Sequence, residues 1–380
     1  MPGQIANKLP RRDNSCSCQV RNALQHRSFA TLNIMVFIAR AKRIICALFA
    51  VIIIASLTLA GCGGDGKTVS AQENLEAALK KGIKPNEMGM VMVLEYHRIN
   101  ETEGNYTRSI ENFKKDLETM YQKGYRLIKF HDLMAGKIGV PAGTTPVVFS
   151  FDDSTESQFR YIKQGGKTVI DPQCALGMLE AFYKQHKDFG YTGMFNYLPA
   201  LFDQPDYKKQ KVDYLYNNGF ELGNHTITHP LLAKLSDEEV QKEITVPIKN
   251  MKSINPNVKV DVLCLPNGSL PQNQALMFDG SYAGTKYHIN WALLVGSNPF
   301  YPSYHYKNPG KLVPRIQVMD YNTQSGAGAD GSGYWFKYFD QHPELRFISD
   351  GDSSTICAPA YMENRLLGDK LPAGTTFLGY

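Results

Sequence analysis

Cysteine and tryptophan are scarce in this chain, which has seven cysteines and two tryptophans among its 380 residues. The cysteines that lie beyond residue 62 are Cys174, Cys264 and Cys357. Because these three are widely separated, they provide neither a disulfide framework nor the paired spacing of a cysteine-rich metal site. One pair could form a disulfide outside the cell, and the sequence leaves the choice of pair open.

An excess of basic charge is also missing from the body of the chain. The formal net charge is +5, but residues 1–61 hold eight of the 41 basic residues and one of the 36 acidic ones. The remainder therefore carries 33 basic and 35 acidic side chains. No basic stripe is present, which argues against nucleic acid as a partner. No internal repeat of fixed period is present either, which argues against a solenoid.

One apolar segment near the N-terminus has the features of an export signal. Residues 44–60 are almost uniformly apolar, and basic side chains precede them at Arg40, Lys42 and Arg43. A basic head, an apolar middle and small residues at the end are typical of a secretory signal peptide. The alternative is a membrane-spanning helix, but such a helix needs about 20 apolar residues and this run is shorter.

The end of this segment, Leu59-Ala60-Gly61-Cys62, resembles the lipobox of bacterial lipoproteins. The resemblance implies that Cys62 is acylated and that the protein is extracytoplasmic, anchored to the cell membrane through a lipid. Met35 would begin a signal peptide of ordinary proportions at 35–61, so we expect residues 1–34 to be untranslated or disordered. Residues 62–88 begin with a glycine-rich stretch, and we interpret them as a tether.

Strand-like and helical patterns alternate along the rest of the chain. Short apolar runs predict buried strands, and apolar residues three or four apart predict helices. The expected strands are 90–97, 126–128, 146–151, 193–197, 220–224 and 260–265. The expected helices are 71–81, 113–123, 175–187, 212–218 and 236–251. This alternation is typical of an α/β architecture with a parallel sheet.

The pattern becomes irregular after residue 315. Residues 325–333 are rich in glycine, serine and aspartate, a composition that predicts a loop. Residues 334–380 could hold a few strands packed on the main domain.

Two adjacent carboxylates, Asp152 and Asp153, directly follow the strand predicted at 146–151. Neighbouring side chains of an extended chain project to opposite sides, so one carboxylate can bind a metal ion while the other accepts a proton. In α/β barrels, active sites lie at this carboxyl end of the strands. A helix cap or a turn also explains such a pair, so the pair alone is a weak signal.

Two histidines four residues apart, His225 and His229, lie within the segment Gly223–Pro230. This spacing predicts that both imidazoles lie on one face of a helical turn, where they can reach a single ion. Two histidines and one carboxylate suit Zn²⁺ and leave a coordination position open for water. The alternative explanation is a pair of surface histidines near the start of a helix.

The order of these motifs is more specific than either motif alone. A strand ending in Asp152-Asp153, followed about 70 residues later by Gly-Asn-His-Thr-Ile-Thr-His-Pro, resembles the polysaccharide deacetylase family, the NodB-homology class of carbohydrate esterases. The resemblance covers roughly residues 90–318. Further matching segments follow in the family's order, at 93–97, 123–125, 193–195, 265–268 and 312–316.

The resemblance implies a distorted (β/α) barrel at residues 89–319, with a small C-terminal appendage of unknown role at 320–380. It also implies one divalent ion held by Asp153, His225 and His229. Such ligands suit Zn²⁺, and they also suit Co²⁺, Ni²⁺, Mn²⁺ or Fe²⁺.

The resemblance further implies roles in the reaction. Asp152 would be the general base that takes a proton from the attacking water. The metal and the backbone N–H of Asn267 would stabilise the oxyanion.

The chain departs from the family pattern in two places. The arginine that steadies the catalytic aspartate is missing near Cys264, and Arg315 on a different strand is a candidate substitute. The histidine that serves as general acid is not recognisable. His288 and His305 are candidates without matching flanks, whereas we expect His97 near the barrel mouth rather than in catalysis.

The expected function is hydrolysis of N-acetyl groups on an envelope or extracellular polysaccharide, of the peptidoglycan or poly-N-acetylglucosamine type. An O-acetyl polysaccharide esterase is one alternative, because the same site chemistry serves both reactions. A catalytically impaired carbohydrate-binding lipoprotein is another. The missing histidine and arginine favour the binding protein, whereas the intact Asp152 favours the enzyme.

Overall fold

The computed structural model describes residues 70–320 and 330–380, which belong to one compact unit. The predicted signal peptide and the predicted lipidation site at Cys62 lie outside these residues. In the described ranges, no helix combines the length and the apolar character needed to cross a membrane.

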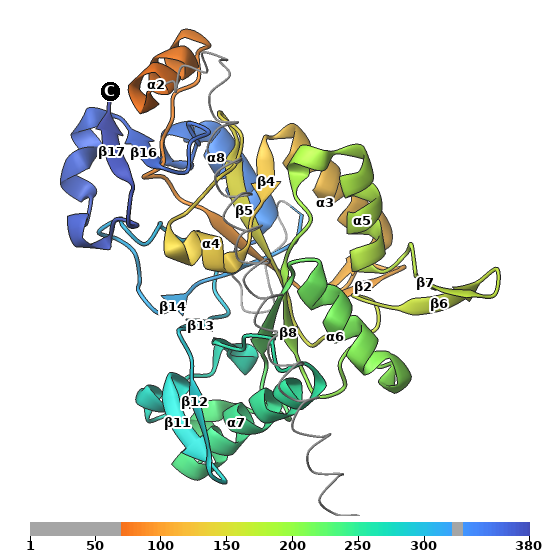
Figure 1. Cartoon of the computed structure of the whole chain (residues 1–380). Helices are drawn as coiled ribbons and strands as arrows, with labels where there is room; N and C mark the ends of the chain where they lie inside the picture. Colours follow the sequence, from red (N-terminus) through yellow and green to blue (C-terminus); the bar gives the residue numbers. More distant parts are fainter. Residues whose placement is uncertain (1–69, 321–329) are drawn as a thin grey trace, which may run out of the picture. The chain divides into compact units, whose positions relative to one another are not determined.

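A parallel β-sheet forms the centre of the molecule (Figure 1). Its strands follow the order β14-β13-β10-β9-β8-β5-β1-β15, and β4 pairs with β5 outside this path. The bounds are β1 Met92–Tyr96, β4 Tyr125–Leu127, β5 Thr145–Phe151, β8 Met194–Tyr197, β9 Glu221–Asn224, β10 Val262–Cys264, β13 Trp291–Leu293, β14 Leu312–Val313 and β15 Ile316–Gln317. The predicted distorted (β/α) barrel is thereby confirmed, and these strands include the six that the sequence predicts.

One short segment joins the two edges of this sheet. Strand β14 pairs with β13 at one edge, and β15 pairs with β1 at the other. Only Pro314 and Arg315 separate β14 from β15 in the chain. The segment 312–317 therefore closes the barrel, and Arg315 lies at the point of closure.

Helices cover the outside of the sheet (Figure 1). They include α3 Ile110–Gln122, α5 Ala175–Gln185, α6 Lys208–Asn217 and α7 Asp237–Ile254. Phe113 of α3 packs in one buried apolar cluster with Phe149 and Phe151 of β5. Ser236 caps α7 and forms a capping box with Glu239, as the sequence predicts.

Alternate residues of the strands face the barrel interior in two layers. The lower layer is apolar and contains Val93, Val148, Met194, Val262, Leu293 and Val313. Two residues further along the strands, the next layer contains Glu95, Ser150, Asn196, Cys264 and Arg315. The carboxyl ends of the strands therefore carry polar side chains into the interior, above an apolar floor.

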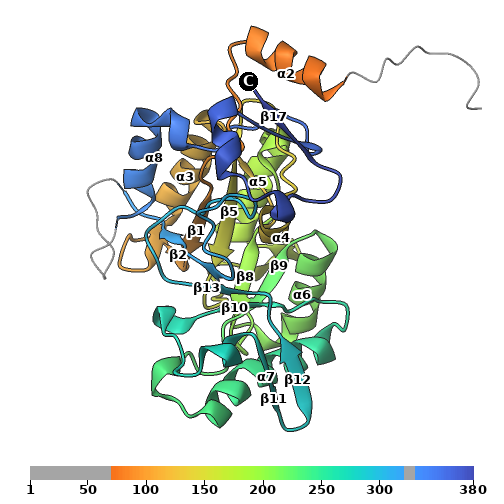
Figure 2. The same ribbon diagram turned by 90° about the vertical axis from the view of Figure 1, so that its left-hand side faces the viewer.

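The C-terminal segment packs against the amino-terminal ends of the strands. The backbone of Met90 exchanges hydrogen bonds with Leu345 and Phe347, and the Thr145 hydroxyl donates to the Phe347 carbonyl at 2.7 Å. Figures 1 and 2 place this segment beside α2 (Ala71–Lys80), away from the hairpin of β11 (Asp279–Tyr282) and β12 (Thr285–His288). This packing seals the end of the barrel that faces away from the Asp152-Asp153 motif.

The C-terminal segment contains more helix than the sequence predicts. Helix α8 spans Ser332–Gln341, so the last two residues of the loop predicted at 325–333 are helical, whereas residues 325–329 of that prediction lie outside the described residues. The helix forms because the residues after the glycine-rich stretch place Trp335 and Phe339 against the core. A two-stranded sheet of β16 (Thr355–Ala358) and β17 (Thr376–Gly379) follows.

Candidate active site

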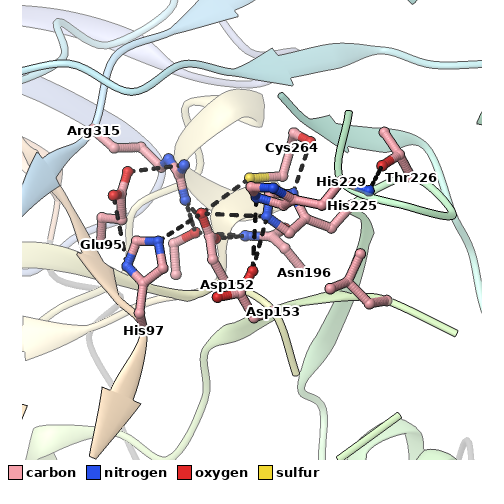
Figure 3. A network of polar contacts seen from close by, with 12 residues as sticks. Glu95, His97, Asp152, Asp153, Asn196, His225, Thr226, His229, Cys264 and Arg315 are labelled. Atoms are coloured by element: carbon pink, nitrogen blue, oxygen red, sulfur yellow. Dashed lines mark hydrogen bonds and ion pairs between the residues drawn. The ribbon is translucent and has the colours of Figure 1, made fainter. Parts of the chain in front are cut away.

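The polar layer of the barrel brings together most of the predicted site residues. Figure 3 shows Asp152 at the centre, with His225, His229 and Cys264 on one side and Arg315, Glu95 and His97 on the other. These side chains come from the carboxyl ends of β1, β5, β9 and β10 and from the closing segment 312–317. Parallel strands bring their carboxyl ends to one face, which explains why residues far apart in sequence meet here.

The backbone around the two motifs adopts unusual conformations. Asp153, Ser154, Thr226 and His229 all have positive φ, at 73°, 45°, 70° and 56°. Non-glycine residues rarely adopt this region, and such residues cluster at functional sites. The predicted helical turn at His225–His229 is wrong, because Pro230 disfavours helical geometry at His229 and the segment forms a loop.

The loop nevertheless places three predicted ligand atoms close together. The Asp153 Oδ1 lies 3.5 Å from the Nε2 of His225 and 3.8 Å from the Nε2 of His229. The ligand atoms of these three residues all lie within 4.8 Å of one another. The two rings lie with their centroids 4.8 Å apart, so their Nε2 atoms can face a common point.

The surroundings of His225 fit a bound metal ion. Its Nδ1 lies 2.9 Å from the backbone carbonyl of Cys264, which fixes Nδ1 as the protonated nitrogen. Its Nε2 is buried and has no hydrogen-bond partner among the described residues. A buried polar atom without a partner is costly, and a metal ion would satisfy it.

A second set of three groups, Asp152, His225 and Cys264, is also close enough to hold an ion. Burial raises the pKa of the Cys264 thiol to about 11, so the thiolate that a metal needs is disfavoured there. Arg315 already lies at Asp152, and its positive charge opposes a cation at the same carboxylate. The set Asp153, His225 and His229 is therefore the better metal site.

Asp152 is held as a carboxylate by several donors. Arg315 Nη1 donates to its Oδ1 at 2.7 Å, and Asn196 Nδ2 donates to the same oxygen at 2.7 Å. Burial favours the neutral acid, but the charge of Arg315 opposes it most strongly, and the pKa of Asp152 lies well below its usual range. Gly223 leaves room for this arrangement, because a Cβ there would lie 2.1 Å from the Asn196 Oδ1.

Arg315, which the sequence offers as a candidate substitute for the missing arginine, lies in contact with Asp152. The side chain is fully buried and also pairs with Glu95, whose Oε2 lies 2.8 Å from Arg315 Nη2. Its Nε donates to the backbone carbonyl of Leu294 at 3.0 Å. The guanidinium therefore joins two carboxylates from different strands and a backbone carbonyl of the polar layer.

His97 belongs to the site, which the sequence did not predict. Its Nε2 lies 3.9 Å from Asp152 Oδ2, its Nδ1 lies 3.8 Å from Glu95 Oε1, and its ring lies 4.8 Å from the ring of Tyr106. A signal was present, because Glu95 and His97 are two residues apart and extend the interior face of β1 beyond Val93.

The two other candidate histidines lie elsewhere. His305 is buried in a ring stack between Tyr301 and Tyr306. His288 is on β12, 61% exposed, and its Nδ1 lies 2.6 Å from Asp279 Oδ1. Neither shares a hydrogen bond, ion pair or ring contact with the Asp152 cluster in the part of the chain that the structure describes.

Asn267 lies in a single 3-10 turn, Pro266–Gly268, that follows β10. Its φ of 53° and ψ of 21° turn the chain sharply just beyond Cys264. No hydrogen bond joins it to the Asp152 cluster within the described ranges, so its predicted role in oxyanion stabilisation stays a prediction. The three cysteines of the described chain, Cys174, Cys264 and Cys357, are free and buried.

A cavity of about 410 Å³ opens beside Glu95 and His97. Its other walls come from the segment Glu103–Arg108 and from residues 317–320. The Arg108 guanidinium in this wall is held by Asp116, Glu103 and Asp320. The cavity therefore has both polar and aromatic walls next to the charged cluster, which suits a polar ligand such as a sugar.

Part of this chain matches a known protein family. Residues 181–287 match the family described as polysaccharide deacetylase. This region is therefore similar to polysaccharide deacetylases. It contains His225, His229 and Asn267, whereas Asp152 and Asp153 precede the matched residues. The match agrees with the family that the motifs resemble, and no curated protein sequence matches the chain.

Solved structures that are similar to this chain share low sequence identity with it. The Streptococcus pyogenes deacetylase PplD in complex with acetate is 15% identical, with 60% of this chain and 92% of that chain covered and a TM-score of 0.46. IcaB from Ammonifex degensii is 17% identical, with 61% and 92% covered and a TM-score of 0.44. BC0361, a polysaccharide deacetylase from Bacillus cereus, is 16% identical, with 60% and 64% covered and a TM-score of 0.42.

Proposed function

We propose that the chain hydrolyses N-acetyl groups of a polysaccharide in the cell envelope or outside the cell. The observation that carries this proposal is the placement of Asp152, a buried carboxylate, beside the group of Asp153, His225 and His229. The family match over residues 181–287 supports the same reaction class. Peptidoglycan and poly-N-acetylglucosamine are the substrate types that we propose.

Asp153, His225 and His229 would hold one divalent ion, for which we propose Zn²⁺. Such an ion lowers the pKa of a water molecule toward neutrality and polarises a carbonyl oxygen. The Cys264 carbonyl fixes the tautomer of His225 that leaves Nε2 free. Asp153 is half-buried, so a substrate can approach the group from the mouth of the barrel.

Asp152 acts as the general base in this proposal. Its pKa is held low chiefly by Arg315 against the effect of burial, so the carboxylate is ionised before the reaction begins. As water attacks the acetyl carbonyl, Asp152 accepts one of its protons. Arg315 and Asn196 fix Oδ1, which leaves Oδ2 as the oxygen that faces His97 and His225.

His97 acts as the general acid. Its Nε2 lies 3.9 Å from Asp152 Oδ2, on the side of the carboxylate away from Asp153. When the carbon–nitrogen bond breaks, the electron pair goes to nitrogen and His97 gives that nitrogen a proton. Arg315 and His97 supply the two functions whose absence favoured a binding protein, so the geometry favours the enzyme.

The test uses the purified protein with added Zn²⁺ and N-acetylglucosamine oligomers as the substrate. We expect acetate release that falls by about 10²- to 10⁴-fold in Asp152→Asn, because general base catalysis contributes about that much. Asp152→Asn should still bind one metal ion per chain, and a chelator should abolish release by the parent protein. His288→Asn, which changes an exposed histidine outside the site, serves as the control variant.

The same assay separates the alternatives. Acetate release from O-acetylated but not from N-acetylated glycans would assign an esterase. Metal binding and glycan binding without any acetate release would assign a binding protein and contradict the proposal.

We also propose that the protein works outside the cytoplasm, anchored through an acylated Cys62. The motif Leu59-Ala60-Gly61-Cys62 at the end of an apolar run supports this location. Labelling of the full chain with a radioactive fatty acid should mark the parent protein and leave Cys62→Ala unlabelled. Equal labelling of both would contradict the lipid anchor.

A further inference from the structure

Lys211 is a fully buried lysine of α6, on the outside of the barrel. Its Nζ donates hydrogen bonds to two backbone carbonyls, that of Phe159 at 2.7 Å and that of Phe202 at 3.0 Å. The ring centroids of the same two phenylalanines lie 5.4 Å and 5.5 Å from this nitrogen. Burial lowers the pKa of the Lys211 ammonium to about 8, so the side chain remains charged at neutral pH. Burying a charge is costly, and the contacts with these carbonyls and rings offset that cost.

The two carbonyls belong to two loops that follow strands of the barrel. Phe159 lies in the loop after β5, and Phe202 lies in the loop after β8. In the second loop, residues 201–203 have φ of 48°, 67° and 51°. Three successive non-glycine residues in the left-handed region are strained, and such strain persists where the surrounding contacts hold it. Lys211 provides such a contact and joins the two loops.

The turn at 201–203 also contacts the residue next to the predicted metal ligand Asp153. The backbone N–H of Phe202 donates to the Ser154 carbonyl at 2.7 Å. On the other side of Asp153, the backbone N–H of Asp152 donates to the Tyr96 carbonyl at 2.9 Å. Asp153 and Ser154 themselves have positive φ, so few alternative backbone shapes would place this carboxylate equally well. The backbone of Asp153 is therefore fixed between β1 and the turn at 201–203.

We propose that Lys211 is a positioning residue for the metal site, which acts by holding the turn at 201–203 against Ser154. The contacts run from Lys211 Nζ to the Phe202 carbonyl, and from the Phe202 N–H to the Ser154 carbonyl. Ser154 directly follows Asp153, so the turn sets where the Asp153 carboxylate lies relative to the two histidines. A ligand that is already in place when the ion arrives gives a higher affinity, because less order is lost on binding. This inference rests on the proposed metal site and adds a residue that lies in neither motif.

The test measures the affinity of the purified protein for Co²⁺, one of the ions that this set of ligands suits. Coordinated Co²⁺ absorbs visible light, so the titration reports on the site without any substrate. Lys211→Met keeps most of the apolar stem and removes the donor to both carbonyls. We expect the Kd for Co²⁺ to rise about 10-fold or more, because groups that orient metal ligands contribute about 10- to 100-fold to affinity.

Leu215→Ala is the control variant, because Leu215 is equally buried on α6 but packs in the apolar core. Both substitutions should lower the urea midpoint, since one removes buried hydrogen bonds and the other leaves a cavity. Only Lys211→Met should weaken the binding of Co²⁺. Parent affinity in folded Lys211→Met, or an equal loss of affinity in Leu215→Ala, would overturn the proposal.

The same titration distinguishes this inference from the proposed function. A parent protein that binds Co²⁺ but releases no acetate would overturn the proposed deacetylation, and the comparison of affinities would still decide the role of Lys211. A parent protein that binds no Co²⁺ would overturn the proposed metal site and this inference with it.

Hydrogen exchange of the unaltered protein covers the case in which Lys211→Met does not fold. The Phe202 N–H donates to Ser154, so its exchange rate reports how firmly the turn is held. If the turn favours metal binding, the metal must favour the turn to the same extent. We expect Zn²⁺ to slow exchange at Phe202 about 10-fold and to leave Ile356 of β16, at the opposite end of the barrel, unchanged. Exchange at Phe202 that ignores Zn²⁺ would refute the inference.

Discussion

Two buried groups of charged side chains lie at opposite ends of β1, and they differ in how completely their polar atoms are bonded. At the amino-terminal end, Glu87 accepts hydrogen bonds from the Ser349 hydroxyl, from the Asp350 backbone and from the Cys357 backbone, so both of its oxygens have partners. At the carboxyl end, His225 Nε2, Glu95 Oε1 and His97 Nδ1 have none among the described residues.

This difference distinguishes a group of side chains that stabilises the fold from a group that is suited to binding or catalysis. Burial raises the pKa of Glu87, and its hydrogen bonds tie residues near the start of the barrel to the C-terminal segment. At the mouth of the barrel, the buried atoms without a partner destabilise the fold. Proteins tolerate such atoms where a substrate or a metal ion completes their bonding. Buried atoms without a partner also occur outside the site, on Asn86, Tyr125, Thr245 and Arg346. The candidate active site is therefore marked by several such atoms that lie together among charged side chains.

Arg315→Met should produce the largest effect and would test the mouth group. The substitution leaves Asp152 and Glu95 without their shared counter-ion, and breaking a buried pair in this way costs about 3–5 kcal/mol of unfolding free energy. We expect that loss in urea unfolding, together with loss of acetate release. Lys184→Met is the control, because Lys184 is exposed and pairs with Glu180 on the same helix, and such surface pairs contribute about 0–1 kcal/mol. A change in Arg315→Met as small as that of the control would contradict this assignment.

Glu87→Ala, at the amino-terminal end of β1, should lower the stability of the protein without lowering its activity. The three donors that Glu87 accepts from would lose their partner, at a cost of about 1–3 kcal/mol for a buried unsatisfied group. We expect a lower urea midpoint with an unchanged kcat for acetate release. Asp369→Ala, which alters an exposed carboxylate of the same C-terminal segment, provides the reference. A loss of kcat in folded Glu87→Ala would show that the two ends are not independent.

A smaller, pH-dependent effect is expected from His131, which bridges Glu221 and Asp261 outside the site. Burial lowers the pKa of His131, but Asp261 and Glu221 outweigh it and raise the pKa to about 9. Its stabilising contribution is therefore fully present below the unfolded pKa of about 6.5 and is lost as the pH rises through about 9. Unfolding measured between these values should show a declining stability that His131→Gln lacks. An identical decline in both proteins would exclude His131 as its origin.

The sequence predicts the architecture well because its signals are local. The strands at 146–151 and 193–197 and the capped helix after Ser236 depend on hydrophobic pattern and capping, and each forms as predicted. The helical turn at His225–His229 fails because spacing alone ignores the effect of Pro230 on the residue before it. Helix α8 was not predicted, because the glycine-rich stretch before it indicates a loop and the apolar residues that form the helix follow directly after that stretch.

The site was predicted in part for a related reason. Asp152, Asp153, His225 and His229 stand in two short motifs and could be selected from sequence. Arg315 could only be named as a candidate, because its contact with Asp152 joins residues 163 positions apart. Glu95 and Asn196 carry no motif, and their importance becomes visible only when parallel strands place them in one layer.

The closing segment 312–317 has a consequence for the order in which the protein matures. A chain emerging from the ribosome or crossing a membrane presents Asp152 long before Arg315, so the base first exists as a hydrated carboxylate without its counter-ion. Only when the last strands join the two sheet edges does the guanidinium arrive between Asp152 and Glu95. Completion of the fold and assembly of the charged centre are therefore one event, and a chain truncated before residue 312 would lack both.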